Sequence, residues 1–317
     1  MTELPCILVA DHRGQGLTAR ADALALAGQR VETTTTVRAT LERLAELAPS
    51  LVLLDPWLPG GAEELGVFAA RGLGALPVLV VVDPDGAEAA LATVRAFPAA
   101  TLDLVRRDAA PAEVQARVER LLALGRERAR VRELEHRAAH DDRTDLLRPE
   151  AFEQRLAEHV SAAQRHKFEL ALLLLDLDAF GQVNKRFDHT VGDLVIAKVG
   201  DAIKKSLRQE DVAGRLGGDE FAVLLPYTAR IEAAHAVRRL RDAVARLGPA
   251  LATRVPGLDV STSIGFETFD GDDLEGETML RAHAELALRE AKRMGGGQAV
   301  YYRSLSARAA PDAPPGA

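Results

Sequence analysis

The sequence predicts an N-terminal α/β domain with a parallel sheet, a long charged helix, and a second domain with buried strands that end in acids. The chain has 317 residues, a length that suggests two domains, and 47% of them are hydrophobic, which is enough for two cores. Residues 4–125 alternate strand-like and helix-like segments five times, a pattern typical of parallel strands with helices on both faces of the sheet. From residue 112 to residue 140 the pattern is helical and charged.

The composition argues against several classes of protein. The net charge of −7 provides no global basic field, so we expect no nucleic-acid partner. Cys6 is the only cysteine, which excludes internal disulfides and multi-cysteine metal sites and fits a reducing compartment. The sequence has no run of 18 apolar residues and no signal-peptide pattern, so we expect no membrane partner and a cytoplasmic location.

The first domain, residues 1–125, is predicted to be a (βα)5 fold. In such sheets the chemistry lies where the parallel strands end, at their carboxyl edge. The predicted strands are Cys6–Val9, Val31–Thr34, Leu51–Leu54, Pro77–Val82 and Thr101–Val105, and the helices reach Leu24 and lie near 41–47, 63–71 and 87–96. The residues at the strand ends are Asp11, Asp55, Val82 and Arg107.

The stretch Leu53–Gly60 resembles the segment around the phospho-accepting aspartate of bacterial receiver domains. This resemblance implies that Asp55 accepts a phosphoryl group and that a histidine kinase or another protein is the partner. Three positions depart from the receiver pattern: Ala10 stands for an acid, Val82 for a hydroxyl residue and Arg107 for a lysine. Phosphorylation needs all three of the replaced groups. Three interpretations stay open: a degenerate receiver used for dimerisation or partner sensing, slow phosphorylation because Arg107 keeps the positive charge, or a loop acid without function.

The charged helix contains the predicted linker, residues 126–140. Its apolar residues recur at spacings of three, four and seven, as in helices that pair. A parallel pair would hold two C-terminal domains close together, whereas an ordinary amphipathic helix would pack on its own domain. The apolar positions are Val114, Val118, Leu121, Leu124, Val131, Leu134 and Ala138.

Acidic residues follow two buried strand patterns in the second domain. Gly217 and Gly218 predict a tight hairpin, because glycine accepts the positive φ that such turns need. Asp219 and Glu220 come next, and the upstream apolar run Glu169–Leu175 ends in further acids at 176 and 178. If the two strands are neighbours, the carboxylates converge, and such a cluster suits Mg²⁺ bound jointly by the protein and by nucleotide phosphates.

The motif Gly217–Phe221 resembles the naming signature of the GGDEF family of diguanylate cyclases. The resemblance extends over roughly residues 138–303 and includes Asp176–Asp193 and Ala284–Gln298. It implies an α+β domain, an antiparallel-dominated sheet with helices around it, like the palm of nucleotide cyclases. The predicted domains are therefore 1–125, the linker 126–140, the GGDEF domain 141–303 and a disordered tail 304–317.

The resemblance implies condensation of two GTP molecules into cyclic di-GMP and two pyrophosphates by a homodimer with two-fold symmetry. An acid that accepts from the N–H groups of guanine, beside an amide that donates to its O6, selects guanine over adenine. By resemblance, the catalytic residues are Asp219 and Glu220; the ligands of Mg²⁺ (or Mn²⁺) are Asp176, the Leu177 carbonyl and Asp219; the substrate-binding residues are Asn184, His189, Asp193 and Lys292; and the inhibitory product site is Arg208 with Asp211.

Two departures bear on catalysis. Gly181 and Gly296 stand where the family pattern has a lysine and an arginine that contact the triphosphate. Each lost charge-assisted contact weakens binding by roughly 1.5–3 kcal/mol unless Lys185, Arg289 or Arg293 substitutes. A second class of function therefore stays open, a receptor that binds cyclic di-GMP through Arg208 and Asp211 and performs no chemistry. Structural roles also stay open for some of these residues. His189 could be a histidine at a helix start, and Arg208 with Asp211 could form a surface ion pair.

Overall fold

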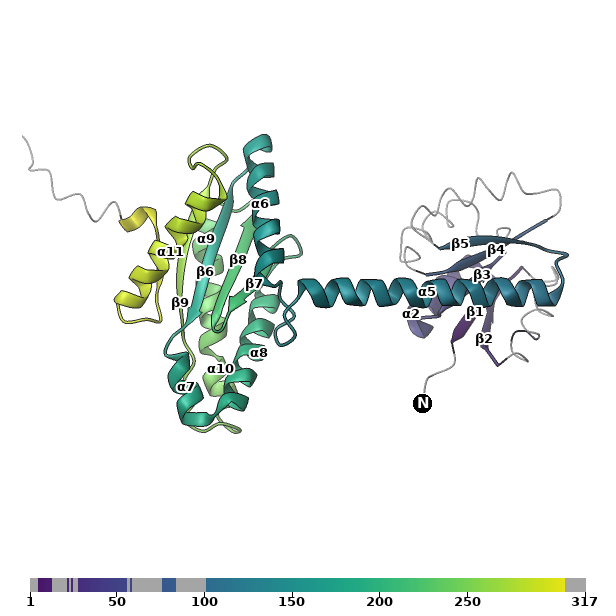
Figure 1. Cartoon of the computed structure of the whole chain (residues 1–317), viewed down its shortest axis with the longest axis horizontal. Helices are drawn as coiled ribbons and strands as arrows, with labels where there is room; N and C mark the ends of the chain where they lie inside the picture. Colours follow the sequence, from purple (N-terminus) through teal and green to yellow (C-terminus); the bar gives the residue numbers. More distant parts are fainter. Residues whose placement is uncertain are drawn as a thin grey trace, which may run out of the picture. The chain divides into compact units, whose positions relative to one another are not determined.

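The structure is a computed structural model that describes residues 5–12, 22, 24, 28–55, 58, 76–83 and 101–305. The chain divides into two compact units, Met1–Leu134 and Glu135–Ala317, each with a sheet of its own (Figure 1). Each unit also has hydrophobic clusters of its own. Several predicted segments lie outside the described residues: residues 13–21 and 23 of the helix that reaches Leu24, the helices near 63–71 and 87–96, residues 56–57 and 59–60 of the receiver-like segment, and residues 306–317 of the predicted tail.

The first unit contains a five-stranded sheet with the order β2-β1-β3-β4-β5. Every pairing in it is parallel, as the alternating pattern predicts, while the resemblance to receiver domains stays a prediction. All residues of β1 and β4 are buried, as expected for a parallel sheet covered on both faces. The bounds are β1 Cys6–Ala10, β2 Arg30–Thr34, β3 Leu51–Leu54, β4 Val78–Val82 and β5 Leu102–Arg106, with helix α2 at Val37–Leu47.

Two of the residues predicted at the strand ends, Asp55 and Arg107, lie in contact at the carboxyl edge of this sheet. Asp11 and Asp55 directly follow β1 and β3, and both are buried. Asp55 Oδ1 lies 3.2 Å from Nη2 of Arg107, whose Nε lies 2.5 Å from Asp83 Oδ1. Burial acts to lower the pKa of Arg107, but the bonds and charges of Asp83 and Asp55 outweigh it and raise this pKa. Phosphorylation of Asp55 stays a prediction.

Helix α5, Pro111–Ala139, contains the predicted linker up to residue 139. Its first turns belong to the core of the first unit, where Val114 and Val118 are buried in one cluster with residues of β1, β3 and β4. Later apolar residues of the helix are exposed, which leaves them available for contact with another molecule. They are Leu124, Val131 and Leu134.

The second unit contains another five-stranded sheet, with the order β10-β9-β6-β8-β7. Its pairings are antiparallel except for β10 with β9, so the sheet is antiparallel-dominated, as the resemblance implies. The central strand β6 is buried along its whole length, because both of its edges are paired and both of its faces are covered. The bounds are β6 Leu170–Leu177, β7 Val212–Gly217, β8 Glu220–Pro226, β9 Thr262–Phe269 and β10 Ala299–Tyr301.

Helices cover both faces of this sheet (Figure 1). One cluster joins Leu173 and Leu175 of β6 to residues of α8 and α9, and a second cluster joins Leu172 and Leu174 to residues of α6 and α11. The alternation follows from the strand period of two, which sends successive side chains to opposite faces. The helices are α6 Pro149–His166, α7 Phe180–Phe187, α8 His189–Ser206, α9 Arg230–Ala245, α10 Leu247–Leu251 and α11 Glu277–Arg293.

Helix α11 packs unusually close to β9 because one strand residue has no side chain. A Cβ atom at Gly265 would lie 2.1 Å from Leu288 N and 2.3 Å from Ala284 O. Neither contact can be relieved by rotating a side chain, since both partners are backbone atoms of the helix. Gly265 therefore fixes the distance between α11 and the sheet, and with it the place of every side chain on the inner face of α11.

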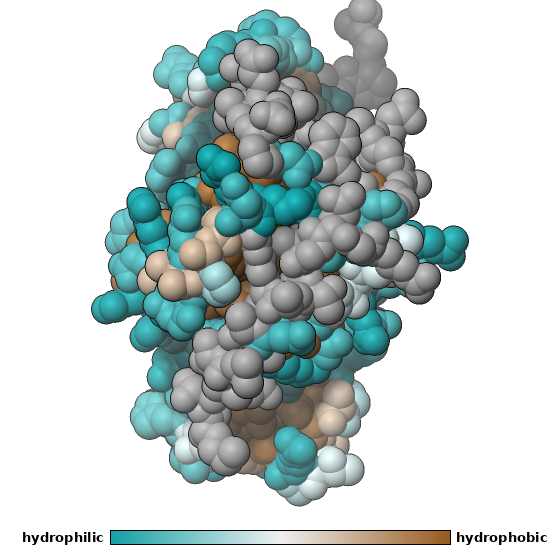
Figure 2. All heavy atoms as spheres, turned by 90° about the vertical axis from the view of Figure 1, so that its right-hand side faces the viewer, coloured by the Kyte–Doolittle hydropathy of each residue, from teal (hydrophilic) through white to brown (hydrophobic). Residues whose placement is uncertain are grey.

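Three further observations concern the surface, the helices and the end of the described chain. Among the coloured atoms of the face in Figure 2, hydrophilic residues predominate. Within the described residues, no helix combines the length and the apolarity needed to cross a membrane. Ser304 and Leu305, the first residues of the predicted tail, form a helical turn, because Leu305 packs against Ala287, Ala291 and Val300.

We predict that Gly265→Ala lowers the free energy of unfolding by about 3 kcal/mol, because the added methyl group would overlap helix backbone. Gly181→Ala is the matched control: nothing lies within 4 Å of a Cβ there, so we expect a change within about 1 kcal/mol, in the stabilising direction for a helix residue. Denaturant unfolding followed by circular dichroism measures both. Equal effects of the two substitutions would show that the α11–β9 contact is not tight.

Candidate active site

The hairpin between β7 and β8 presents two acids at one end of the sheet. Gly217 and Gly218 turn the chain with φ values of 156° and 50°, in the region that favours glycine. Asp219 follows at the turn and is half-buried, and Glu220 begins β8 with an exposed side chain. The two glycines thus place both carboxylates at the hairpin, as the sequence predicts.

The end of β6 lies against this hairpin. Asp176 is directly opposite Glu220 in the β6–β8 register. The backbone N–H of Leu177 donates to the Asp219 carbonyl oxygen at 3.3 Å, and Thr262 Oγ1 of β9 donates to the Asp176 carbonyl oxygen at 3.0 Å. Three acids from two distant segments therefore meet at the same end of the sheet.

Asp176 is the buried member of this group, with 5% of its surface exposed. Burial raises the pKa of its carboxyl group, the charges of Asp219 and Glu220 raise it further, and the hydrogen bond and charge of Lys292 act in the opposite direction. Lys292 Nζ of α11 lies 2.5 Å from Asp176 Oδ2 and offsets part of the cost of burying the charge. Lys292 thus acts directly on the acid cluster.

The donors present fit a magnesium ion that is shared with a ligand. In the parts of the chain that the structure describes, no three His, Cys, Asp or Glu side chains converge as a complete metal site. Mg²⁺ usually binds one or two carboxylates and completes its shell with water and substrate phosphates. Asp176, Asp219 and Glu220 bring to this end of the sheet carboxylate oxygens, the type of donor that Mg²⁺ uses in such sites.

Asp178 has a structural role that the sequence did not reveal. Its carboxylate accepts hydrogen bonds from Ser261 Oγ (2.7 Å), Ser263 Oγ (2.6 Å) and the Gly297 N–H (2.7 Å). A Cβ at Gly296, where φ is 77°, would lie 2.9 Å from Asp178 Oδ1. Asp178 therefore joins the loop after α11 to the start of β9. In the sequence, the only indication of this role was the group of hydroxyl residues around position 262.

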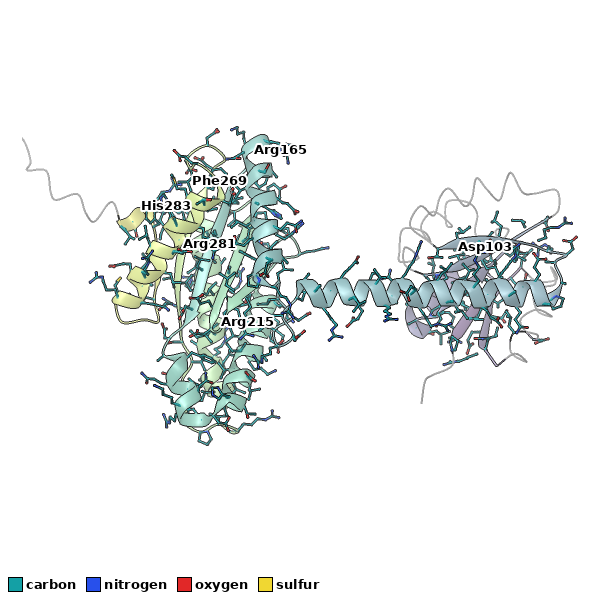
Figure 3. The ribbon with its side chains drawn as sticks, in the orientation of Figure 1. Asp103, Arg165, Arg215, Phe269, Arg281 and His283 are labelled. Atoms are coloured by element: carbon teal, nitrogen blue, oxygen red, sulfur yellow. The ribbon has the colours of Figure 1, made fainter. Side chains whose placement is uncertain are left out.

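Arg215 of β7 is a second such residue (Figure 3). Its Nη2 and Nε donate to the Gly218 carbonyl at 2.7 and 3.1 Å, and its Nη1 donates to both carboxylate oxygens of Asp141 at 3.1 and 3.2 Å. Burial acts to raise the pKa of Asp141, but hydrogen bonds from Thr144 and Arg215 outweigh it and lower this pKa. The glycine turn is thus fastened to the segment that follows α5.

The two residues expected to contact the base, Asn184 and Asp193, and the expected substrate residue His189 lie on the adjoining helices α7 and α8. Asn184 packs so closely on α8 that a Cβ at Gly192 would be 1.9 Å from its Oδ1, which places Asn184 beside the turn that carries Asp193. His189 is exposed at the start of α8. Asp193 pairs with Arg143, at 3.0 Å between Oδ2 and Nη2, although both side chains are about half exposed. Their role in binding stays a prediction.

The residues of the expected inhibitory site lie in the turn between α8 and β7. The Asp211 carboxylate accepts from the backbone N–H of Arg208 at 2.8 Å, not from its guanidinium group. Burial raises the pKa of Asp211 against the opposing effect of this hydrogen bond. Both residues line a groove of about 700 Å³ in the second unit. Its lining also includes Arg155, His159, Lys204, Phe168 and Tyr227.

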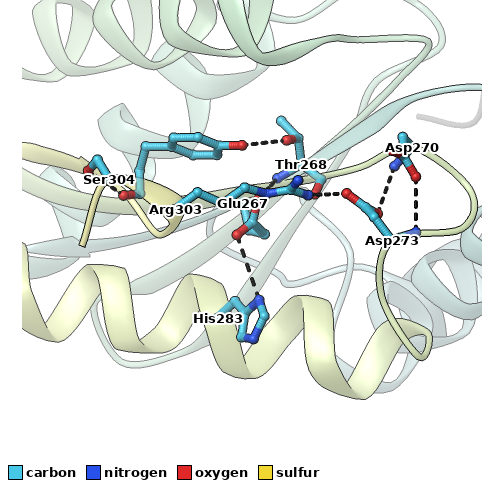
Figure 4. A network of polar contacts seen from close by, with 8 residues as sticks. Glu267, Thr268, Asp270, Asp273, His283, Arg303 and Ser304 are labelled. Carbon is cyan, nitrogen blue, oxygen red and sulfur yellow. Dashed lines mark hydrogen bonds and ion pairs between the residues drawn. The ribbon is translucent and has the colours of Figure 1, made fainter. Parts of the chain in front are cut away.

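A separate polar network stabilises the opposite end of β9 (Figure 4). Glu267 is fully buried and accepts a hydrogen bond from Arg303 Nε at 2.9 Å, while its other oxygen lies 3.7 Å from His283 Nδ1. Arg303 also pairs with Asp273 and donates to the Thr268 carbonyl at 2.8 Å. These contacts attach the chain after β10 to β9, far along the strand from the acids.

Comparison with known proteins gives a family match for the second unit. Residues 138–298 match the family described as "Diguanylate cyclase, GGDEF domain". The diguanylate cyclase TpbB of Pseudomonas aeruginosa is 36% identical over 166 residues, which cover 52% of this chain and 37% of that protein. The diguanylate cyclase DgcP of the same species is 36% identical over 159 residues, which cover 50% of this chain and 23% of that protein. The chain therefore spans well under half the length of these relatives.

A solved structure supports the fold of this unit. The crystal structure of the coiled coil and GGDEF domain of DgcB from Caulobacter crescentus, in complex with c-di-GMP, has a TM-score of 0.52 to this chain at 27% sequence identity. The likeness covers 60% of this chain and 96% of that one. It confirms the predicted fold class of the C-terminal domain.

We predict that Asp176→Asn raises the melting temperature at pH 7 more than at pH 4. The pKa of Asp176 is raised in the folded protein, so its contribution to stability is full below the usual aspartate pKa and is lost as pH rises through the folded value. The neutral amide avoids that loss. Calorimetry of the full chain at both pH values measures the difference, with Asp242→Asn of an exposed acid as control. An equal shift at both pH values would contradict the assignment.

Proposed function

The chain belongs to the GGDEF-domain family of diguanylate cyclases through residues 138–298, and we propose that it condenses two GTP molecules into cyclic di-GMP and two pyrophosphates. One observation carries this proposal: Asp176, Asp219 and Glu220 meet at one end of the sheet, with Lys292 paired to the buried acid. Such a group of acids with one cation suits the binding of a metal–nucleotide complex.

In the proposed reaction the ribose 3′-oxygen of one GTP attacks the α-phosphorus of the other. The new O–P bond forms as the bond between the α-phosphorus and the bridging oxygen breaks, and pyrophosphate leaves with the electron pair. Asp219 or Glu220 accepts the proton of the 3′-hydroxyl. A second such step in the opposite direction closes the ring, so catalysis depends mainly on positioning and charge neutralisation.

Magnesium, or manganese, is the proposed cofactor. Asp176, Asp219 and the Leu177 carbonyl would hold it, with Glu220 beside them. When bound, the ion would neutralise phosphate charge and favour the ionised 3′-oxygen. Lys292 would then exchange its contact with Asp176 for one with the phosphates, which its half-exposed side chain allows.

Guanine selection is proposed for Asn184 and Asp193. The packing of Asn184 on Gly192 supports this proposal, because it brings the amide and the carboxylate to one side of the α7–α8 pair. Arg143 must release Asp193 before the base can bind it. The cost of this release is small, since exposed ion pairs contribute only about 0–1 kcal/mol.

The product contains two nucleotides, so two sites must face each other, and we propose a homodimer with two-fold symmetry. The exposed apolar residues Leu124, Val131 and Leu134 of α5 support a helical pair, because apolar side chains at these spacings form a seam. We also propose that the first unit controls this pairing, through phosphorylation or through a protein partner.

Product inhibition is proposed at Arg208 and Asp211. The groove that contains them also presents Arg155 and Lys204 as cations and the ring pair Phe168–Tyr227, whose centroids lie 4.3 Å apart. Guanidinium groups bind phosphates, and rings and guanidinium groups stack on bases, so the lining suits a cyclic dinucleotide. The same groove keeps a second candidate function open, a receptor that binds cyclic di-GMP without turnover.

We predict that the nucleotide-free full chain converts GTP into cyclic di-GMP in the presence of Mg²⁺, and that Asp219→Ala lowers the rate by about 100-fold or more. Chromatography of the products measures the rates of the parent and of the variant, at protein concentrations above and below the one at which the dimer forms. Removal of Mg²⁺ by EDTA should abolish synthesis. Absence of product at every concentration would sink the cyclase proposal and favour the receptor.

We predict that Arg208→Ala weakens cyclic di-GMP binding by about tenfold or more, because a charge-assisted contact to phosphate is lost. In the cyclase assay the variant should resist inhibition by added product at an unchanged initial rate. Arg165→Ala, an exposed arginine of α6 that does not line the groove, serves as control. Calorimetric titration gives the affinities, and parent-like binding by Arg208→Ala would refute the assignment.

A further inference from the structure

A cavity of about 240 Å³ lies beside the acidic hairpin, between α11 and strands β6, β7 and β8. Glu220 contributes to it from the hairpin, and Lys292 contributes from α11. The cavity therefore borders the group of acids described above. Its apolar lining consists of Leu174, Leu175, Leu216, Phe221 and Leu288.

Helix α11 supplies three cations to this lining, and two of them are engaged. Arg281 pairs with Glu285 at 3.0 Å and also with Glu153, and Lys292 pairs with Asp176 at 2.5 Å. Arg289 has no hydrogen bond or ion pair within the described part of the chain. It stands three residues before Lys292, so the two side chains share one face of the helix.

Within the described residues, neither the end of α11 after Lys292 nor the loop that follows it offers a comparable cation. Arg293 donates twice to Glu290, at 2.7 Å each, and does not line the cavity. The loop after α11 is Gly295–Gly297, with positive φ at all three residues, and a side chain at Gly296 would collide with Asp178. Arg289 is therefore the arginine on this part of α11 that can turn toward an anion beside Lys292.

We propose that Arg289 binds the terminal phosphates of the nucleotide, so that Arg289 and Lys292 together hold the part of GTP that leaves as pyrophosphate. This inference rests on the proposed function. A triphosphate placed among Asp176, Asp219 and Glu220 meets three carboxylates and needs cations on its other side. Arginine is well suited, because its planar fork donates two parallel hydrogen bonds to one phosphate.

The test compares ligands that differ in their phosphates. Calorimetric titration in Mg²⁺ would use the α,β-methylene analogue of GTP, which cannot be turned over, and GMP, which lacks the terminal phosphates. We expect Arg289→Ala to weaken binding of the analogue by about tenfold or more and to leave GMP binding unchanged. Arg289→Lys should recover part of the affinity, and Arg293→Ala, the matched control one turn along the helix, should bind both ligands as the parent does.

Three results would overturn the assignment: parent-like binding of the analogue by Arg289→Ala, equal weakening of the analogue and GMP, or no binding of the analogue by the parent. Synthesis of cyclic di-GMP is measured separately. If the parent makes no product but the binding pattern appears, the proposed function fails and the phosphate site stands. If the parent makes product and Arg289→Ala binds the analogue normally, the function stands and the site fails.

Discussion

The burial of the Asp176 carboxylate, with Lys292 beside it, is the constraint around which this end of the second unit is arranged. A charged acid at the end of an otherwise apolar strand is costly, and the nearby acids Asp219 and Glu220 add to that cost. Lys292 offsets it only if α11 lies close to the sheet, and the missing side chain of Gly265 permits that approach. The close packing of α11 on β9 is therefore what allows a cation to reach the buried acid at the end of β6.

Two further side chains hold this end of the sheet rigid. Arg215 joins the Gly218 carbonyl to Asp141, and Asp178 joins the loop after α11 to Ser261 and Ser263. Each connects segments far apart in the chain through several hydrogen bonds, which restrain the hairpin against the segment after α5 and the loop after α11 against β9. Groups held in this way need little reorganisation when a ligand binds, which would favour the phosphoryl transfer proposed above.

Charge is distributed unevenly within the second unit, and this distribution separates two kinds of site. Acids gather at the hairpin, where a cation and a nucleotide would compensate them. The groove that contains Arg208 is lined by cations and rings and also by acids, and a ligand with phosphates and bases would fit beside the cations. Among the acids of that groove, Asp211 accepts a hydrogen bond from the backbone N–H of Arg208 and so shapes the turn, which leaves the Arg208 guanidinium group available.

The sequence by itself determined the strands, the hairpin and the identity of the acids, because apolar runs, paired glycines and a strand period of two are local properties. The long segment β6 and the positions of Asp176, Asp219 and Glu220 at strand ends follow from them. Only the tertiary structure decided which groups meet: Lys292 with Asp176, Arg143 with Asp193, Arg303 with the buried Glu267. These pairings depend on register and on how closely helices pack against the sheet, and no local pattern in the chain encodes either.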